Sequence, residues 1–327
     1  MKDIPRTGCF DSPSIAVDSD PAANIRDLRL MAAPIQGLTE AAWRSVHFRM
    51  FGCFQGDVEY FTPFVRVEKG EVRKRDLHDF TSELNAGIPL TPQIIFRDVD
   101  EWHLLVDTLA EAGASRIDMN LGCPFVPQIR KGRGAGLIGN ADVMSRIADA
   151  MLSYAGSVEF SVKMRLGVSE PSEAWGLVDI LNVMPLRHIA VHPRTAKQQY
   201  RGELLIEEMH EFTSRLRHPV VFNGEISTPR DILELKSVYS GVMAGRGLLA
   251  RPSLFAEYIS GEEWDAHRRE EAFLSLLSST SAILAERLCG HTQLSDKMKA
   301  YWEYVPAGLD KKLVKQGKKK GNVFSLQ

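Results

Sequence analysis

Eight short β-prone runs, separated by helix-like amphipathic stretches, constrain the fold of this chain more than any other feature. They are LRLMAA (28–33), DVEYFT (57–62), PQIIF (92–96), RIDMN (116–120), EFSVKM (159–164), HIAVH (188–192), PVVFN (219–223) and GVMAG (241–245). Strands that alternate with helices form parallel βαβ units. Eight such units are what a (β/α)8 barrel requires, so we predict an α/β fold of the TIM-barrel type. An open, doubly wound sheet is the alternative.

The stretches between the runs carry helix-boundary residues. Helices are expected over 39–50, 98–113, 140–154 and 227–238. Thr39, Asp98 and Ser227 stand where an N-cap belongs, and Gly113 stands where a helix ends.

The chain divides into three parts by composition. Residues 1–27 are rich in Asp, Ser and Pro without hydrophobic periodicity, which predicts an N-terminal arm. The barrel is expected over 28–258, and a small C-terminal helical domain over 259–327. That domain ends in 311–327, a stretch with six lysines and no acid. Such a stretch is either a solvated tail or an arm that contacts RNA phosphates.

Composition excludes several classes of protein. The longest weakly polar stretch, 274–285, is too short to span a membrane, and the N-terminus lacks the apolar core of a signal peptide. We therefore expect a cytoplasmic protein. The four cysteines, Cys9, Cys53, Cys123 and Cys289, lack zinc-ligand spacing, so we expect reduced thiols and no metal site. A net charge of −2 leaves nucleic-acid binding to local basic patches.

Polar residues gather where the expected strands end. In a TIM barrel the active site lies at the C-terminal ends of the strands. Those ends hold Pro34, Asn120, Lys163, His192, Asn223 and the pair Gly245-Arg246, with Gln93 inside the third strand. A buried lysine is costly without an anion or a partner. The set therefore predicts one shared site rather than separate core polar groups.

The loop after the fourth strand carries the most specific motif. Gly122 permits a tight turn and Pro124 stiffens the chain, so Cys123 is held over the barrel mouth. A lone cysteine is usually an inert small apolar residue. In this context we favour a positioned acid, because an unperturbed thiol keeps its proton near neutral pH.

These segments resemble the tRNA-dihydrouridine synthase family over most of the chain. The segment IDMNLGCP (117–124), followed by Gly134-Ala135, resembles the family signature. Five further segments resemble, in order, its flavin loop, its lysine strand, its His-x-Arg-Thr segment and its two phosphate-binding turns: MAAPIQGLTE (31–40), SVKMRLG (161–167), HPRTAKQQYRG (192–202), NGEI (223–226) and AGRGLLARP (244–252). One motif would be weak evidence, but six in the right order are strong.

The resemblance implies non-covalently bound FMN as the cofactor. Lys163 would approach the flavin ring, Gln93 and Asn120 would hydrogen-bond it, and His192 would lie near cofactor and phosphate. The remaining cofactor-binding residues would be Pro34, Ile35 and Gln36 at the ring edge, and Asn223, Gly224, Glu225, Gly245 and Arg246 around the phosphate.

The resemblance also implies the reaction. NADPH would reduce FMN, hydride would pass to C6 of a tRNA uridine, and Cys123 would protonate C5 to give 5,6-dihydrouridine. The target base must leave its stack to reach the barrel. The substrate-binding residues would be Arg130, Arg165, Arg194, Lys197 and Tyr200. Lys131 and Arg133 are further RNA-facing candidates, while Lys297, Lys299, Tyr301 and Trp302 could equally pack in the core. We expect a monomer with tRNA as its partner and the helical domain as a tRNA-binding unit.

Two other functions compete with this one. An FMN-dependent dehydrogenase of a free pyrimidine, such as dihydroorotate, shares the Asn-x-x-Cys-Pro type of loop, but the basic clusters disfavour it. A non-catalytic RNA-binding protein is disfavoured by the presence of Cys123, Lys163 and His192 together.

Overall fold

The computed structural model describes residues 28–52 and 58–321; the predicted arm, Cys9 and Cys53 lie outside these ranges. The strands are β1 (Arg29–Ala32), β2 (Val58–Phe61), β3 (Val65–Glu68), β4 (Glu71–Val72), β5 (Leu90–Thr91), β6 (Gln93–Ile95), β7 (Arg116–Leu121), β8 (Glu159–Gly167), β9 (Leu186–Thr195), β10 (Val220–Phe222) and β11 (Gly241–Ala244). The helices are α1 (Ala41–His47), α2 (Lys74–Phe80), α3 (Val99–Glu111), α4 (Val126–Ile129), α5 (Ala141–Met151), α6 (Val178–Val183), α7 (Ile206–Thr213), α8 (Pro229–Leu235), α9 (Arg246–Ala250), α10 (Leu254–Ser260), α11 (Ala266–Arg287), α12 (His291–Tyr301) and α13 (Lys311–Lys320). Each of the eight predicted runs overlaps a strand, and β7, β8 and β9 extend beyond their runs.

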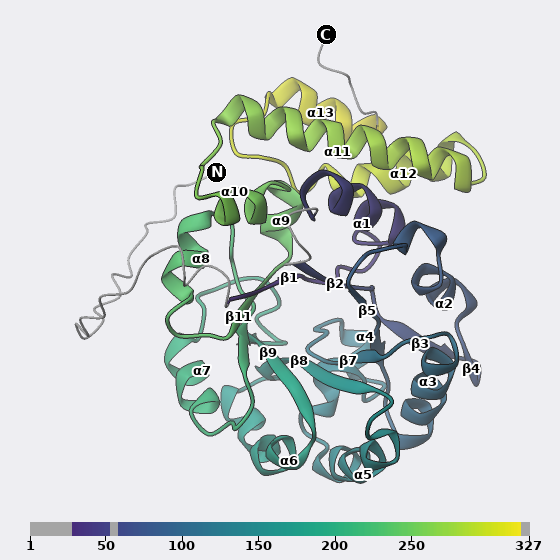
Figure 1. The fold of residues 1–327 in the computed structure, drawn as a ribbon, viewed down its shortest axis with the longest axis vertical. Helices are drawn as coiled ribbons and strands as arrows, with labels where there is room; N and C mark the ends of the chain where they lie inside the picture. Colours follow the sequence, from purple (N-terminus) through teal and green to yellow (C-terminus); the bar gives the residue numbers. More distant parts are fainter. Residues whose placement is uncertain (1–27, 53–57, 322–327) are drawn as a thin grey trace.

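Eight parallel strand positions close into a barrel (Figure 1). β1 pairs with β11 on one side and β2 on the other, and the pairing continues in parallel from β6 through β7, β8, β9 and β10 to β11. β2 pairs with β5 and β3 pairs with β6. β2 and β3 are therefore two parts of one interrupted barrel strand, and β5 and β6 are two parts of the next. The interruptions contain Pro63 and Pro92, which have no N–H to give to the ladder. Closure confirms the predicted barrel and excludes the open sheet.

The two-residue period of the strands decides which side chains enter the barrel. On β8, Val162 and Met164 belong to the hydrophobic core between sheet and helices. Lys163 and Arg165, on the opposite face, point to the interior. An apolar layer that includes Met31, Phe61 and Met243 fills part of the interior.

Two predicted helix boundaries are confirmed and two are wrong. Asp98 caps α3 by accepting from the Glu101 amide at 2.8 Å, and Gly113 follows its end with φ +93°. The sequence predicts N-caps at Thr39 and Ser227, but the structure has Glu40 and Thr228 in these positions, one residue later in each case.

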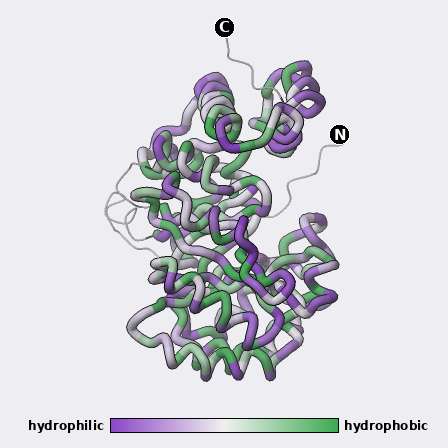
Figure 2. Tube along the Cα trace, turned by 90° about the vertical axis from the view of Figure 1, so that its right-hand side faces the viewer, coloured by the Kyte–Doolittle hydropathy of each residue, from purple (hydrophilic) through white to green (hydrophobic). Residues whose placement is uncertain are grey.

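The three C-terminal helices α11, α12 and α13 lie together at the top of Figure 1, beside α1 and α10 of the barrel's outer layer. Figure 2 shows these helices at the top of the molecule with much hydrophilic colouring. Within the lysine-rich stretch, residues 311–320 form the helix α13, which Asp310 caps. Tyr301 and Trp302 are both buried, so they belong to the core.

None of the described helices is long and apolar enough to cross a membrane.

The packing of α13 against Trp302 depends on a single glycine. A Cβ at Gly317 would lie 2.1 Å from the Trp302 ring, so Gly317→Ala must push the two apart despite the higher helix propensity of alanine. We expect a loss of about 1–3 kcal/mol in the free energy of unfolding, measured with urea. Gly139→Ala is the control because a Cβ there meets nothing within 4 Å. If the two variants had equal free energies of unfolding, close packing of Gly317 on the Trp302 ring would be contradicted.

Candidate active site

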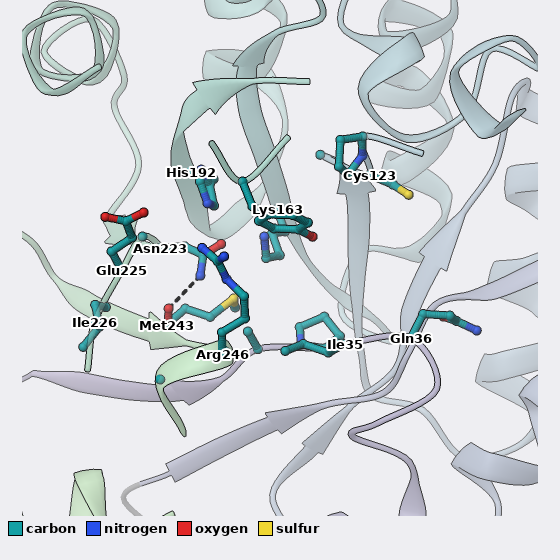
Figure 3. Close-up of a pocket in the computed structure, with 18 of the residues that line it drawn as sticks. Ile35, Gln36, Cys123, Lys163, His192, Asn223, Glu225, Ile226, Met243 and Arg246 are labelled. Atoms are coloured by element: carbon teal, nitrogen blue, oxygen red, sulfur yellow. Dashed lines mark hydrogen bonds between the residues drawn. The ribbon is translucent and has the colours of Figure 1, made fainter. Parts of the chain in front are cut away.

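A cavity of about 770 Å³ opens at the C-terminal ends of the barrel strands. Most residues proposed from the sequence line it: Pro34, Ile35, Gln36, Gln93, Asn120, Cys123, Lys163, Arg165, His192, Tyr200, Asn223, Gly224, Glu225, Gly245 and Arg246. In Figure 3, Cys123 and Gln36 lie on one side of the cavity, and Asn223 and Glu225 lie on the other. Lys163 and Arg246 stand between them.

A buried chain of hydrogen bonds fixes the two amide side chains of the cavity floor. Gln93 Nε2 donates to Asp118 Oδ2 at 2.7 Å, and Asn120 Nδ2 donates to Gln93 Oε1 at 2.7 Å. Asn120 Oδ1 then accepts the amides of Gly122 and Cys123 at 3.0 and 2.8 Å. A carboxylate can only accept and a backbone amide can only donate, so the two ends set the orientation of both amides. Asn120 is left with N–H to offer the cavity.

Asp118 is a site residue that the sequence reasoning missed. It is fully buried and also accepts from Ser161 Oγ at 2.6 Å. Burial raises the pKa of Asp118 to about 6, although its hydrogen bonds and the Lys163 charge oppose the shift. The sequence could have indicated it, because Asp118 lies two residues before Asn120 on β7, and residues two apart on a strand point to the same face.

Lys163 brings a positive charge into the barrel without an ion-pair partner among the described residues. Burial, together with the charge of Arg165, lowers the pKa of Lys163 to about 8. The side chain is therefore a cation that gains from any anion placed in the cavity.

His192 is held in its neutral form. Burial is the main cause that drives its pKa far below the usual range, and the charges of Arg165, Lys163, Arg194 and Arg246 add to it. Its Nδ1 is buried and makes no hydrogen bond within the described chain. A neutral imidazole can donate from one nitrogen and accept at the other.

Tyr200 stands at the cavity wall between two guanidinium groups. The Cζ atoms of Arg246 and Arg165 lie 4.6 and 5.2 Å from its ring centre, and the His192 ring meets it edge to face at 6.4 Å. Cation–π attraction of this kind holds the ring and both cations together. Arg165 is anchored further by donating to the carbonyls of Gly122 and Thr195, each at 3.0 Å.

Cys123 is seated on a turn that only glycine permits. Gly134 has φ +60°, and a Cβ on it would lie 2.8 Å from the Cys123 Cβ. Burial raises the pKa of the Cys123 thiol, against the opposing effect of nearby Arg165 and Lys163. The thiol therefore keeps its proton at neutral pH, as a proton donor requires.

Glycine turns line the opposite end of the cavity. Gly247 packs so closely on the neighbouring turn that a Cβ would lie 1.8 Å from the Ile226 carbonyl oxygen. A Cβ on Gly224 would lie 3.2 Å from Pro193. Asn223 Nδ2 donates to the Met243 carbonyl at 2.7 Å and ties the two turns (Figure 3). Arg246, between the turns and Tyr200, forms no ion pair within the described residues.

Three proposed substrate residues do not line the cavity. Arg130 and Lys197 are exposed on the surface. Arg194 is only 2% exposed, forms an ion pair with Glu225 and donates to the Gly202 carbonyl at 2.6 Å. It thereby holds Glu225 in a left-handed conformation, φ +46°.

Of the two further candidates beside Arg130, Lys131 is exposed and Arg133 turns inward. Arg133, expected to face RNA, is buried and pairs with Glu101 at 2.5 Å. Conversely, Glu303, Tyr304 and Val305 of the helical domain line the cavity, although no motif marks them. No cluster of metal-ligating side chains occurs in residues 28–52 and 58–321.

Comparison with known proteins assigns the family. A model described as Dihydrouridine synthase (Dus) matches residues 31–321. The chain belongs to the dihydrouridine synthase family. The resemblance carried by the six motifs, and with it the expectation of a flavin-dependent oxidoreductase, is confirmed.

Individual members of the dihydrouridine synthase family are only moderately similar. The tRNA-dihydrouridine(16) synthase of Ralstonia nicotianae is 31% identical over 239 residues, 69% of this chain and 71% of that one. The tRNA-dihydrouridine synthase B of Pseudomonas putida is 27% identical over 264 residues, 78% of this chain and 76% of that one. Among solved structures, morphinone reductase aligns with 74% of this chain and 89% of its own at 12% identity and a TM-score of 0.48, too distant to carry an argument.

The buried charge of Lys163 predicts a stability effect with a defined pH dependence. Lys163→Met should raise the free energy of unfolding of the apoprotein by about 1–3 kcal/mol at pH 7, because a desolvated cation is removed. Since the folded pKa, about 8, is below that of an unfolded lysine, wild-type stability rises with pH above 8. The advantage of the variant should therefore vanish near pH 10.5. Urea unfolding across this range measures it, with the exposed Lys74→Met as control. An unchanged free energy of unfolding for Lys163→Met at pH 7 would show that the buried Lys163 charge does not destabilise the fold.

Proposed function

We propose that this chain reduces a specific uridine of tRNA to 5,6-dihydrouridine, with FMN as cofactor and NADPH as reductant. The observation that carries the proposal is the position of the Cys123 thiol on the rim of a cavity that also holds Lys163, Arg246 and the glycine turns. The related proteins named tRNA-dihydrouridine synthases support the choice of tRNA as substrate.

The cavity residues fit an anionic, flat cofactor with a phosphate. Lys163 would face the ring system, and the fixed N–H groups of Asn120 and Gln93 would donate to ring acceptors. The turns at Gly224 and Gly245 would allow the backbone to approach the phosphate closely, and Arg246 would supply a cation. When bound, FMN supplies the hydride that reaches C6 of the uridine.

The protein contributes the proton and the position of the base. Cys123 would transfer its thiol proton to C5 of the uridine and then regain one from solvent. Its raised pKa keeps that proton available, and the Asn120 hydrogen bond fixes the loop that carries it. Tyr200, braced by Arg165 and Arg246, offers a face for a base that has left its stack.

The remaining parts of the proposal concern the surroundings of the site. The helical domain would hold tRNA, with α13 presenting its lysines to phosphates. We expect the protein to act as a monomer. Reconstitution with FMN, followed by NADPH oxidation with and without unmodified tRNA and mass spectrometry of the product nucleosides, tests the function. Turnover with a free pyrimidine and none with tRNA would favour the alternative dehydrogenase.

The role of Cys123 gives a prediction that separates chemistry from packing. Cys123→Ala should bind FMN and accept electrons from NADPH as the wild type does, while reoxidation by unmodified tRNA slows by ~10²–10⁴-fold, the usual effect of losing a general acid. Stopped-flow absorbance of the flavin measures both halves. A hydroxyl is a weaker acid than a thiol, so Cys123→Ser should remain slow. Reoxidation of the Ala variant at the wild-type rate would mean that Cys123 is not the acid.

The basic face of α13 predicts salt-dependent RNA binding. Replacing Lys311, Lys312 and Lys315, all exposed, by Gln should weaken tRNA binding and reduce the slope of log Kd against log salt by about one for each phosphate that is no longer neutralised. Filter binding at several salt concentrations measures the slope, and Lys236→Gln on the barrel is the control. An unchanged slope would leave α13 as solvated surface.

A further inference from the structure

Three successive backbone carbonyls of the turn before α1 are each held by a long side chain. Lys297 Nζ donates to the Gly37 carbonyl at 2.7 Å, and Tyr301 Oη donates to the Leu38 carbonyl at 2.6 Å. Arg44 Nη1 donates to the Thr39 carbonyl at 2.6 Å. Lys297 and Tyr301 come from α12, about 260 positions away in the chain, whereas Arg44 is local. The sequence had offered both α12 residues as RNA-facing or core candidates; here they touch the barrel.

The same turn forms part of the active-site wall on its other side. Ile35 and Gln36 line the cavity, directly before the three braced carbonyls. Within the turn, the amides of Leu38 and Thr39 both donate to the Ile35 carbonyl, at 3.0 and 3.1 Å. These hydrogen bonds tie Leu38 and Thr39 to Ile35, so a shift of the carbonyls of residues 37–39 would also shift Ile35 and Gln36.

The two braces from α12 are well shielded from water. Tyr301 is 2% exposed, and the Lys297 side chain is 14% exposed and also pairs with Glu40 at 2.6 Å. Glu303, Tyr304 and Val305, which follow α12 without a break, line the cavity themselves. The helical domain therefore contacts the site in two places: α12 holds the turn that lines the cavity, and residues 303–305 line the cavity themselves.

We propose that α12 positions the cofactor-binding turn: Lys297 and Tyr301 are positioning residues that set Ile35 and Gln36 for FMN. The inference rests on the proposed function in that FMN is the ligand named. It assigns the helical domain a part in cofactor binding that is separate from holding tRNA.

The test uses two variants that keep the packing of α12 and remove its hydrogen bonds to the turn, together with the ion pair between Lys297 and Glu40. Tyr301→Phe retains the buried ring, and Lys297→Met retains the aliphatic stem. Lys299→Met, on the same helix but paired only with the exposed Asp296, is the matched control. Gly317→Ala is a second control, because it weakens the packing of the domain at Trp302 without touching the turn.

Two measurements are made on each full-length protein. FMN titration by fluorescence should show the dissociation constant rising about 5–30-fold in the double variant Lys297→Met/Tyr301→Phe, the loss expected for two hydrogen bonds, one of them charged. Hydrogen exchange of the apoprotein should show the Leu38 and Thr39 amides exchanging about tenfold faster or more. Both quantities should stay at wild-type values in Lys299→Met.

Each outcome bears on one claim. Unchanged FMN affinity and unchanged exchange in the double variant would overturn the positioning role. An equal loss of FMN affinity in Gly317→Ala, at equal loss of stability, would also overturn it, since general loosening would then be the cause. If the wild type binds no FMN, the proposed function fails, and the exchange rates of Leu38 and Thr39 still decide whether α12 braces the turn.

Discussion

Unpaired positive charge in the barrel interior is the constraint on which the rest of the site depends. Lys163 and Arg246 lie in the cavity without a carboxylate partner in the described chain, and Arg165 is bound only to carbonyls and an aromatic face. Burial is the main cause that holds His192 in its neutral form, and these charges add to it; they also favour an anionic ligand. Burial disfavours the charged forms of Lys163 and Arg165, so a bound anion would stabilise the fold as well as serve the reaction.

Charge attracts an anionic ligand but does not orient it, so the cavity also needs neutral hydrogen-bonding groups in fixed positions. The chain from Asp118 through Gln93 and Asn120 to the amide of Cys123 provides them, because its ends permit only one orientation of the amides. It connects the floor of the barrel to the loop that carries the thiol. A single buried carboxylate therefore influences both the amide groups of the cavity floor and the loop that carries Cys123.

The helical domain is part of this arrangement rather than an appendage. Its α12 holds the turn that lines one wall, and the residues after α12 line another. α13 lies against Trp302 only because residue 317 is glycine. The exposed lysines of α13 and the buried braces of α12 thus lie on neighbouring helices, in agreement with the two roles proposed for the domain.

The sequence by itself determined the barrel strands, the Cys123 loop and the glycine turns. Each of these depends on local chemistry: strand periodicity, the turn around Gly122, and close approach at Gly224 and Gly245. Only the tertiary structure decided which charged side chains face the ligand. Arg194, Arg133 and Lys297 look like RNA contacts in the sequence, yet they are buried against Glu225, Glu101 and the turn at Gly37. Their partners lie between 31 and 260 positions away, so no local pattern marks them. The same holds for Glu303, Tyr304 and Val305, which become cavity wall only once α12 docks on the barrel.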